Sequence, residues 1–272
     1  NNSKGLPTNA VYGFLKMIKN TLNIYRPEYA IIAMDSRTPT FRKIRYPEYK
    51  ANREATPEEL KTQIPYIEKL IEALKLPKIR VDGIEADDII ATLTKNATQE
   101  GFEVVIISGD KDLMQLVSEK TLMIDTLKNK TYGIEAVIEK LGVKPELVRD
   151  YLAITGDASD NIPGVRGIGP KGASSLLNEY GNLDEIYKKI DSIKNKKHQT
   201  ALLKYKEEAS LSRELVTLKE DVEFELKVSE SGLKEPDKEK LMDLLSELEF
   251  TSELKELLTT KKNININSDI KV

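Results

Sequence analysis

Two patterns alternate along the first half of the chain, and this alternation constrains its fold more than any other feature. Short apolar runs are separated by longer segments whose apolar residues recur at helical spacing. The runs that we expect to form strands are Tyr29–Asp35, Lys78–Asp82, Glu103–Ser108 and Thr121–Asp125. Buried parallel strands typically have this form. The first half is therefore predicted to be α/β, with a mostly parallel sheet flanked by helices.

Helical patterns fill the remaining segments. The clearest begins at Thr56, the expected N-cap, with Pro57 as first helical residue, and another spans Glu85–Glu100. The later helices are expected at Pro145–Thr155, Pro170–Tyr180, Leu183–Ile190, Lys196–Ser212, Asp237–Leu248 and Thr251–Leu258. In that half only Leu215–Leu218 departs from the helical pattern. We therefore expect an α/β core over residues 1–132, a helical subdomain over 133–258 and a flexible tail or linker over 259–272.

Two residue types are almost missing from the chain, which has no Cys and one His, His198. These counts exclude disulfides, Cys-ligated zinc, thiol nucleophiles and metal sites with several histidines. His198 lies in a polar helix start and is expected to be exposed. Chemistry must therefore depend on carboxylates, Lys, Arg, Tyr or hydroxyls. Apolar runs too short for a membrane span, and the lack of a signal-peptide pattern, predict a cytoplasmic protein.

Acidic residues follow the predicted strands at the ends where parallel α/β sheets bind ligands. Eight of them, from four regions of the chain, are candidates: Asp35, Glu85, Asp87, Asp88, Asp110, Asp112, Asp157 and Asp160. Any one of them could simply cap a helix. Capping does not account for three acids in four residues. Gathered carboxylates need cations, and oxygen ligands without Cys or His suit Mg²⁺ or Mn²⁺. We therefore predict a site for one or two divalent metals, of the kind that supports phosphoryl transfer.

A basic stretch directly follows Asp35. Residues 37–53 contain six basic residues and one acidic residue, so their net charge is +5 in a chain of net charge −3. Aromatic residues are interleaved with the cations, an arrangement typical of single-stranded nucleic-acid binding. The alternative is a solvated basic loop. The position of the stretch beside the proposed metals favours nucleic acid.

A glycine-rich turn lies in the helical half. Gly167–Gly172 matches G-x-G-x-x-G, but no apolar strand precedes it, so a dinucleotide site is excluded. Gly164–Gly169 is better interpreted as a tight turn between two helices whose N–H groups would receive a phosphate, with Arg166 and Lys171 adding charge. Such a hairpin would bind duplex without reading its sequence. A turn with no ligand is the alternative.

Taken in order, these motifs resemble the 5′-nuclease domain of bacterial DNA polymerase I, a member of the flap-endonuclease superfamily. The matching segments are Gly5–Phe14, Met34–Ser36, Thr40–Arg42, Tyr49–Arg53, Gly83–Asp88, Ser108–Leu113 and Thr155–Gly169. The resemblance implies a PIN-like, mostly parallel sheet, a basic arch at about residues 37–60 and a helical subdomain with a helix–hairpin–helix motif.

The resemblance also implies a function. Members of this family are structure-specific 5′ nucleases, acting as 5′→3′ exonucleases and flap endonucleases on branched or nicked DNA in primer removal and repair. Catalysis would use two Mg²⁺ ions, with Mn²⁺ as substitute, and K⁺ would bind at the hairpin. We expect a monomer near the nucleoid, with polymerase domains in the same parent chain.

Residue roles follow from the same resemblance. Asp35, Glu85, Asp87 and Asp110 match the ligands of the more tightly held metal. Asp112, Asp157 and Asp160 match those of the second, and Asp88 supports the cluster. Lys50 and Arg53 would steer the scissile phosphate. The expected DNA-binding residues are Arg37, Arg42, Lys43, Arg45, Tyr49, Gly164, Arg166, Gly167, Gly169 and Lys171.

One departure keeps alternatives open. The family has a further strand ending in Asp upstream of the segment matching Asn2–Phe14, and this sequence begins after it. We expect that strand either to belong to the protein or to be missing from a truncated product. A non-catalytic module that binds DNA junctions is therefore one rival, and a PIN-like ribonuclease is another. The glycine hairpin and the large helical half argue against the ribonuclease.

Overall fold

The computed structural model describes residues 1–266, and side chains as far as residue 258. The chain forms two compact units that interleave in sequence. Unit 1 contains residues 1–32, 54–79 and the chain from 225 onward, and unit 2 contains residues 33–53 and 80–224. All the predicted site residues belong to unit 2.

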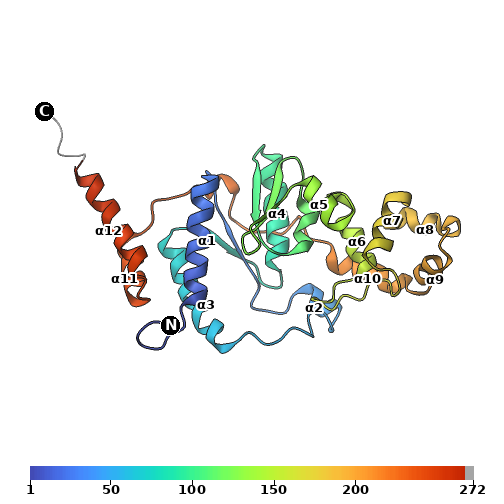
Figure 1. Cartoon of the computed structure of the whole chain (residues 1–272), viewed down its shortest axis with the longest axis horizontal. Coiled ribbons are helices and arrows are strands. Elements are labelled where there is room, and N and C mark those ends of the chain that lie inside the picture. The colour runs from blue at the N-terminus through green and yellow to red at the C-terminus, as the bar shows by residue number, and fades with distance from the viewer. Residues whose placement is uncertain (267–272) are drawn as a thin grey trace. The chain divides into compact units, whose positions relative to one another are not determined.

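Unit 1 is helical. Its helices are α1 (Asn9–Tyr25), α3 (Glu58–Ala73), α11 (Lys238–Glu247) and α12 (Thr251–Ile266) (Figure 1). Their apolar faces share one core, in which Val11, Leu70 and Leu244 are buried. α3 begins one residue later than predicted, with Pro57 rather than Thr56 as N-cap. α12 continues past the predicted start of the tail to Ile266, and the rest of that tail, residues 267–272, lies outside the described residues.

Two small sheets contain the strands. β1 (Ile32–Met34) pairs with β2 (Lys78–Arg80). β3 (Val104–Ile107) pairs in parallel with β4 (Thr121–Asp125), which pairs antiparallel with β5 (Lys130–Tyr132). The parallel register aligns Val104 with Thr121 and Ile107 with Ile124.

The four predicted strands are all present, and β5 is an addition that the sequence did not indicate. The single sheet that we expected is divided, because among the described residues β1–β2 and β3–β4–β5 are separate hydrogen-bonded sets. β1 is also partly rather than fully buried along its whole length. The α/β organisation with a helical C-terminal part is confirmed.

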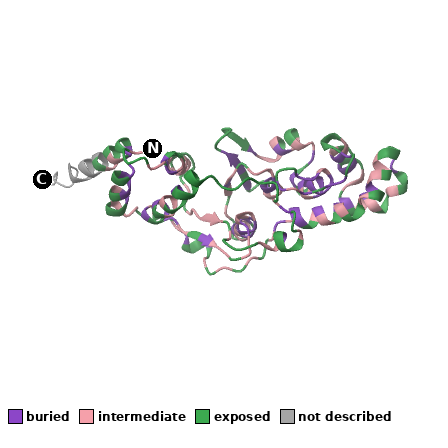
Figure 2. Ribbon diagram, turned by 90° about the horizontal axis from the view of Figure 1, so that it is seen from below, coloured by how far each residue is buried: buried purple, intermediate pink, exposed green. Residues whose placement is uncertain are grey.

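Helices make up most of unit 2. They are α2 (Phe41–Arg45), α4 (Ala86–Gln99), α5 (Ile134–Leu141), α6 (Val148–Thr155), α7 (Pro170–Tyr180), α8 (Leu183–Lys188), α9 (Lys196–Lys204) and α10 (Lys206–Val216). The 3₁₀ helices η1 (Lys111–Leu116), η2 (Pro145–Leu147) and η3 (Ile190–Ser192) connect them, and η4 (Val228–Glu230) lies in unit 1. Their buried residues concentrate on inward faces (Figure 2). α6 is almost entirely buried, so it forms the centre of this core.

Two helix predictions in this half need correction. The helix expected at Lys196–Ser212 is divided into α9 and α10 at Tyr205. Leu215–Leu218 does not break the helical pattern as expected, because α10 continues to Val216 and buries Leu215 and Val216 on its inner face. In the described part of the chain, no helix has the length and apolarity needed to cross a membrane.

Candidate active site

Strand ends and helix starts place six of the predicted acids. Asp35 follows β1, and its Oδ1 accepts a hydrogen bond from the Ala86 amide, 2.9 Å away, in the first turn of α4. This bond ties the end of β1 to the helix that carries Glu85 and Asp87. Asp110 follows β3 and caps η1, because its Oδ1 accepts a bond from the Asp112 amide at 3.0 Å.

The loop between α6 and α7 contributes the remaining acids. A two-way backbone pairing of Asp157 with Ile162, at 2.8 and 3.0 Å, closes this loop and holds Asp157 and Asp160. Carboxylate oxygens of Asp112, Asp157 and Asp160 all lie within 4.8 Å of one another. All three residues are buried. We call these three residues the acidic trio.

Asp112 is the electrostatically least satisfied member of the trio. Its Oδ1 is buried and accepts no hydrogen bond from the residues that the structure describes. Burial, together with the charges of Asp110 and Asp157, raises the pKa of Asp112 well above its usual value. A buried carboxylate oxygen facing other carboxylates is suited to a cation.

Asp157 has the opposite balance. Burial opposes its ionisation, but hydrogen bonds from Ser159 and the charge of Lys111 outweigh burial and lower the pKa of Asp157. Ser159 donates from its amide at 2.9 Å and from its hydroxyl at 2.6 Å, and Lys111 Nζ lies 3.1 Å from the same Oδ1. Asp157 is therefore held ionised and in place.

The second group of acids surrounds Asp87. Burial raises the pKa of Asp87 to about 7, with the charges of Asp110, Asp35 and Glu85 adding to the effect and Lys50 opposing it. We call Asp35, Glu85, Asp87 and Asp110 the strand-end group. Because Asp110 raises the pKa of both Asp87 and Asp112, it connects this group to the acidic trio.

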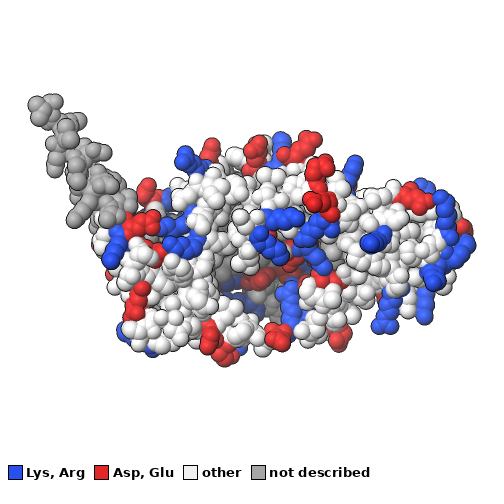
Figure 3. Space-filling view, in the orientation of Figure 1, with Lys and Arg blue, Asp and Glu red and all other residues white. Residues whose placement is uncertain are grey.

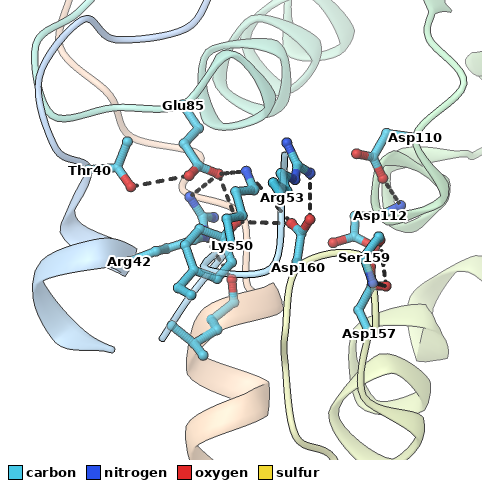
Figure 4. A network of polar contacts seen from close by, with 12 residues as sticks. Thr40, Arg42, Lys50, Arg53, Glu85, Asp110, Asp112, Asp157, Ser159 and Asp160 are labelled. Carbon is cyan, nitrogen blue, oxygen red and sulfur yellow. Dashed lines mark hydrogen bonds and ion pairs between the residues drawn. The ribbon is translucent and has the colours of Figure 1, made fainter. Parts of the chain in front are cut away.

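Glu85 and Asp160 are linked through residues of the basic stretch (Figure 4). The Tyr49 hydroxyl lies 3.0 Å from Glu85 Oε2 and 3.1 Å from Asp160 Oδ2. Lys50 Nζ lies 3.1 Å from Glu85 Oε2 and 3.6 Å from Asp160 Oδ2. Arg53 donates to Asp160 Oδ1. Lys50 and Arg53, the predicted catalytic cations, therefore lie at the acidic site.

Backbone contacts fix this placement. The Lys50 amide donates to the Asp160 carbonyl at 2.9 Å. Asn52 Nδ2 donates to the Ala158 carbonyl at 2.6 Å, and Asn161 Nδ2 donates to the Glu48 carbonyl at 2.7 Å. Within unit 2, residues 48–53 of the predicted arch are thus attached to the loop that carries the trio.

Arg42, a predicted DNA contact, is buried against Asp88, which we expected to support the acidic cluster. Arg42 is 2% exposed and donates to both oxygens of Asp88, at 2.6 and 2.8 Å. It also donates to the carbonyls of Leu215 and Thr217, at 2.7 and 3.0 Å. Asp88 is fully buried and accepts a further bond from the Lys219 amide at 2.9 Å. The pair joins α2, α4 and the end of α10, so Arg42 cannot lie on a DNA-binding surface.

Four further predicted DNA contacts vary in their exposure. Tyr49 is only 4% exposed, so its ring is not available for base stacking, and burial together with Glu85 and Asp160 raises the pKa of its hydroxyl. Lys43 Nζ donates to the carbonyls of Pro47 and Tyr49, and Arg45 pairs with Glu214 at 2.9 Å. Arg37 is exposed.

The glycine hairpin lies between α6 and α7, as predicted. Gly164 has a φ of +63°, and a Cβ there would lie 2.4 Å from the Gly156 nitrogen, so only glycine fits this close approach. Gly164 is buried and its amide donates to Ser212 Oγ at 2.9 Å, so it is not placed to meet a phosphate. The remaining predicted hairpin residues are exposed: Arg166, Gly167, Gly169 and Lys171.

Lys111 and Thr40 are site residues that we did not predict. Thr40 Oγ1 donates to Glu85 Oε1 at 3.1 Å, and Lys111 pairs with Asp157. Lys111 lies between Asp110 and Asp112 in the sequence, so its position was a usable signal. For Thr40 nothing in the local sequence indicates the contact. His198 is half-buried rather than exposed.

Family models match most of the chain. Residues 1–142 match the 5′-3′ exonuclease N-terminal resolvase-like domain, and residues 143–239 match the 5′-3′ exonuclease C-terminal SAM fold. The boundary between these models lies at 142/143, compared with our division at 132/133.

Individual relatives agree with the models. A 5′-3′ exonuclease of Aquifex aeolicus is 41% identical over 255 residues, which cover 94% of this chain and 87% of that protein. A DNA polymerase I of Caldicellulosiruptor bescii is 42% identical over 261 residues, covering 94% of this chain and 31% of the relative. The chain thus spans less than a third of that polymerase.

A solved structure shows the same fold. The flap endonuclease of bacteriophage T5, in a pseudo-enzyme–product complex with DNA and metal ions, superposes with a TM-score of 0.68 at 27% identity. The match covers 79% of this chain and 82% of that one. With both family models and close relatives in agreement, the chain belongs to the 5′-3′ exonuclease family.

Proposed function

We propose that the acidic site of unit 2 hydrolyses phosphodiesters near the 5′ end of branched, flapped or nicked duplex DNA, using two divalent cations, Mg²⁺ or Mn²⁺. The observation that carries the proposal is the placement of seven carboxylates in two groups joined by Asp110. The family assignment supports a nuclease, and the T5 relative is known as a complex with DNA and metal ions.

The acidic trio fits a divalent cation. It offers oxygen ligands only, within 4.8 Å of one another, and the partnerless Asp112 Oδ1 is buried among them. Hard cations such as Mg²⁺ and Mn²⁺ prefer such ligands. Asp112, Asp157 and Asp160 would therefore hold one ion, and Lys111 would keep Asp157 ordered beside it.

We assign a second cation to the strand-end group. Burial, and after it the negative charges of Asp110, Asp35 and Glu85, raise the pKa of Asp87, and a bound cation would offset these charges. Bound divalent ions would supply water activation and stabilisation of charge on the phosphate. We assign Asp88 a supporting role rather than a metal-binding role, because Arg42 donates hydrogen bonds to both of its carboxylate oxygens.

The protein's own cations complete the site. Lys50 and Arg53 lie against Glu85 and Asp160, where they can orient a scissile phosphate and oppose the negative charge that grows on it. Tyr49 stays protonated because its pKa is raised, so it acts as a hydrogen-bond donor that positions Glu85 and Asp160 rather than as a base. Lys43 and Arg45 continue the basic surface beyond Lys50.

DNA would extend from this site to the hairpin. Arg166, Gly167, Gly169 and Lys171 are exposed at the start of α7 and would meet the duplex backbone, with K⁺ held by hairpin carbonyls. Arg37 would contact the 5′ single strand. We further propose a monomer that acts in the cytoplasm at the nucleoid, either alone or joined to polymerase domains as in the relatives.

The test is cleavage of a 5′-flap DNA by the full-length protein in Mg²⁺, with and without EDTA. We expect metal-dependent cleavage, and Asp110→Ala should abolish turnover while DNA binding is largely kept. Asp243→Ala, an exposed acid on α11, is the matched control. Cleavage that persists in EDTA would contradict the metal mechanism. Binding of flap DNA without cleavage in Mg²⁺ or Mn²⁺ would favour the non-catalytic junction module.

A further inference from the structure

A second basic segment lies outside the predicted arch and hairpin. Residues 188–206 contain seven lysines and one acid, so their net charge is +6 in a chain of net charge −3. This exceeds the charge of the arch stretch. The segment includes the end of α8, η3 and the whole of α9.

The fold turns these lysines outward. α9 and the preceding η3 segment anchor themselves through the buried Ile193 and Leu202, while the lysines between and beyond them are exposed. We define the α9 patch by its exposed lysines: Lys194, Lys196, Lys197, Lys204 and Lys206. Blue side chains gather over α8 and α9 in the space-filling view (Figure 3).

The charge in the first turn of α9 does not serve the stability of the helix. Its first turn contains Lys196 and Lys197 and no acid. Cations are disfavoured there, because the positive end of the helix dipole and exposed N–H groups lie at the N-terminus. Asn195 caps two of those N–H groups, with bonds of 3.0 and 3.3 Å to the amides of Lys197 and His198. Helix stability therefore does not explain the first-turn lysines, and binding of an anionic partner would.

The α9 patch lies next to the hairpin. A Cβ on Gly172, in the first turn of α7, would lie 2.9 Å from His198 Cε1. The imidazole in the first turn of α9 thus packs directly on the helix start that follows Gly169. Arg166 and Lys171 of the hairpin and Lys196 and Lys197 of the patch belong to neighbouring helix starts, and all four are exposed.

We propose that the α9 patch is a second contact surface for the phosphate backbone of duplex DNA, extending the footprint from the hairpin away from the acidic site. The inference rests on the proposed function, since it assumes that duplex reaches the hairpin. The side chains that define the patch are all lysines, so its contribution is electrostatic and independent of sequence.

Length dependence follows from this geometry. A duplex arm that ends at the hairpin would miss the patch, whereas an arm that is one helical turn longer, about 10 bp, would also reach it. Each lost phosphate contact lowers the slope of log Kd against log salt concentration by about 0.9. Removing two lysines should therefore lower that slope by about 1.8, so that the loss of long-arm affinity grows about 60-fold as salt falls from about 1 M to about 0.1 M.

The experiment compares Lys196→Gln/Lys197→Gln with Lys120→Gln/Lys130→Gln, an exposed control pair just before β4 and in β5, with the same change in net charge. Fluorescence anisotropy in EDTA measures Kd for long-arm and short-arm flap DNA over a series of KCl concentrations, and thermal unfolding verifies that both variants fold. We expect weaker binding and a smaller salt slope for the patch variant on the long arm, and little effect on the short arm.

The outcomes separate the two proposals. Equal affinity of the two variants for long-arm DNA, while wild type cleaves flap DNA, would overturn the patch and leave the nuclease intact. Equal losses in both variants would also overturn it, because only net charge would then matter. A wild-type protein that does not cleave flap DNA would instead count against the proposed function.

Discussion

Asp87 and Asp88 are neighbours in sequence and have opposite environments. Asp88 is fully buried, and Arg42 with the Lys219 amide satisfies its oxygens. Asp87 is surrounded by other acids that, together with burial, raise its pKa to about 7. The two carboxylates face different sides of one helix. Asp88 stabilises the fold, whereas Asp87 adds uncompensated negative charge to the acidic site. The comparison shows that burial alone does not identify a functional acid, whereas the nature of its partners does.

Breaking the buried pair of Arg42 and Asp88 should give the largest loss of stability. Arg42→Met leaves Asp88 charged, buried and without its main partner, which typically costs about 3–5 kcal/mol of unfolding free energy. Chemical denaturation measures the loss. The double variant Arg42→Met/Asp88→Asn should be less destabilised than the sum of the two single changes, because the stranded charge is removed. Strict additivity would show that the pair does not act as one unit.

Removing the charge of an acid of the trio should raise the stability of the metal-free protein instead of lowering it. Asp112→Asn removes a charge from a buried group with a partnerless oxygen, so in metal-free buffer we expect stability to rise by about 1–2 kcal/mol. The same change should reduce Mg²⁺-dependent cleavage strongly, because a proposed ligand is lost. Denaturation in EDTA and cleavage in Mg²⁺ are the two measurements. A variant that loses stability in EDTA would place Asp112 with Asp88, among the structural acids.

The raised pKa of Asp87 should make the stability of the metal-free protein depend on pH. A carboxyl whose folded-state pKa is raised keeps its proton in the folded state after the unfolded chain has lost it, so stability falls as pH rises. Asp87 should therefore destabilise the metal-free protein progressively from about pH 4 to about pH 7, with no further change above. Thermal unfolding in EDTA across this range measures the slope, and Asp87→Asn should make it shallower. An unchanged slope in that variant would refute the raised pKa.

The smallest stability effect is expected at the exposed edge of the site. The Arg53 side chain is half exposed, so its pair with Asp160 is screened by solvent and Arg53→Ala should cost at most about 1 kcal/mol. Cleavage should fall far more than stability, because Arg53 is proposed to orient the scissile phosphate. The kinetic and denaturation losses are compared directly. A large loss of stability with intact turnover would show that Arg53 has a structural role rather than a role in orienting the phosphate.

Sequence reasoning located the strands because each is a short apolar run with an acid near its end, and periodicity located most helices. β5 escaped because Lys130–Tyr132 has only one apolar side chain that becomes buried, Tyr132. The helical state of Leu215 and Val216 escaped because two apolar neighbours are compatible with a helix face or a strand.

The limits at the site have a different origin. Asp87 and Asp88 cannot be distinguished locally, since the partner of Asp88 lies 46 residues away in the basic stretch. The same long-range pair explains why Arg42 was expected to bind DNA. Charge patterns predict which residue types gather, but packing decides which charges face each other.

The central claim is that the acidic trio and the strand-end group form two joined cation sites. Counting the bound Mn²⁺ ions tests this claim most directly. Calorimetric titration of wild type and Asp112→Asn, with Asp243→Ala as control, measures stoichiometry and affinity. We expect two ions per chain in wild type and in the control, and the loss of one in Asp112→Asn. The same stoichiometry in all three proteins, or no binding at all, would contradict the account.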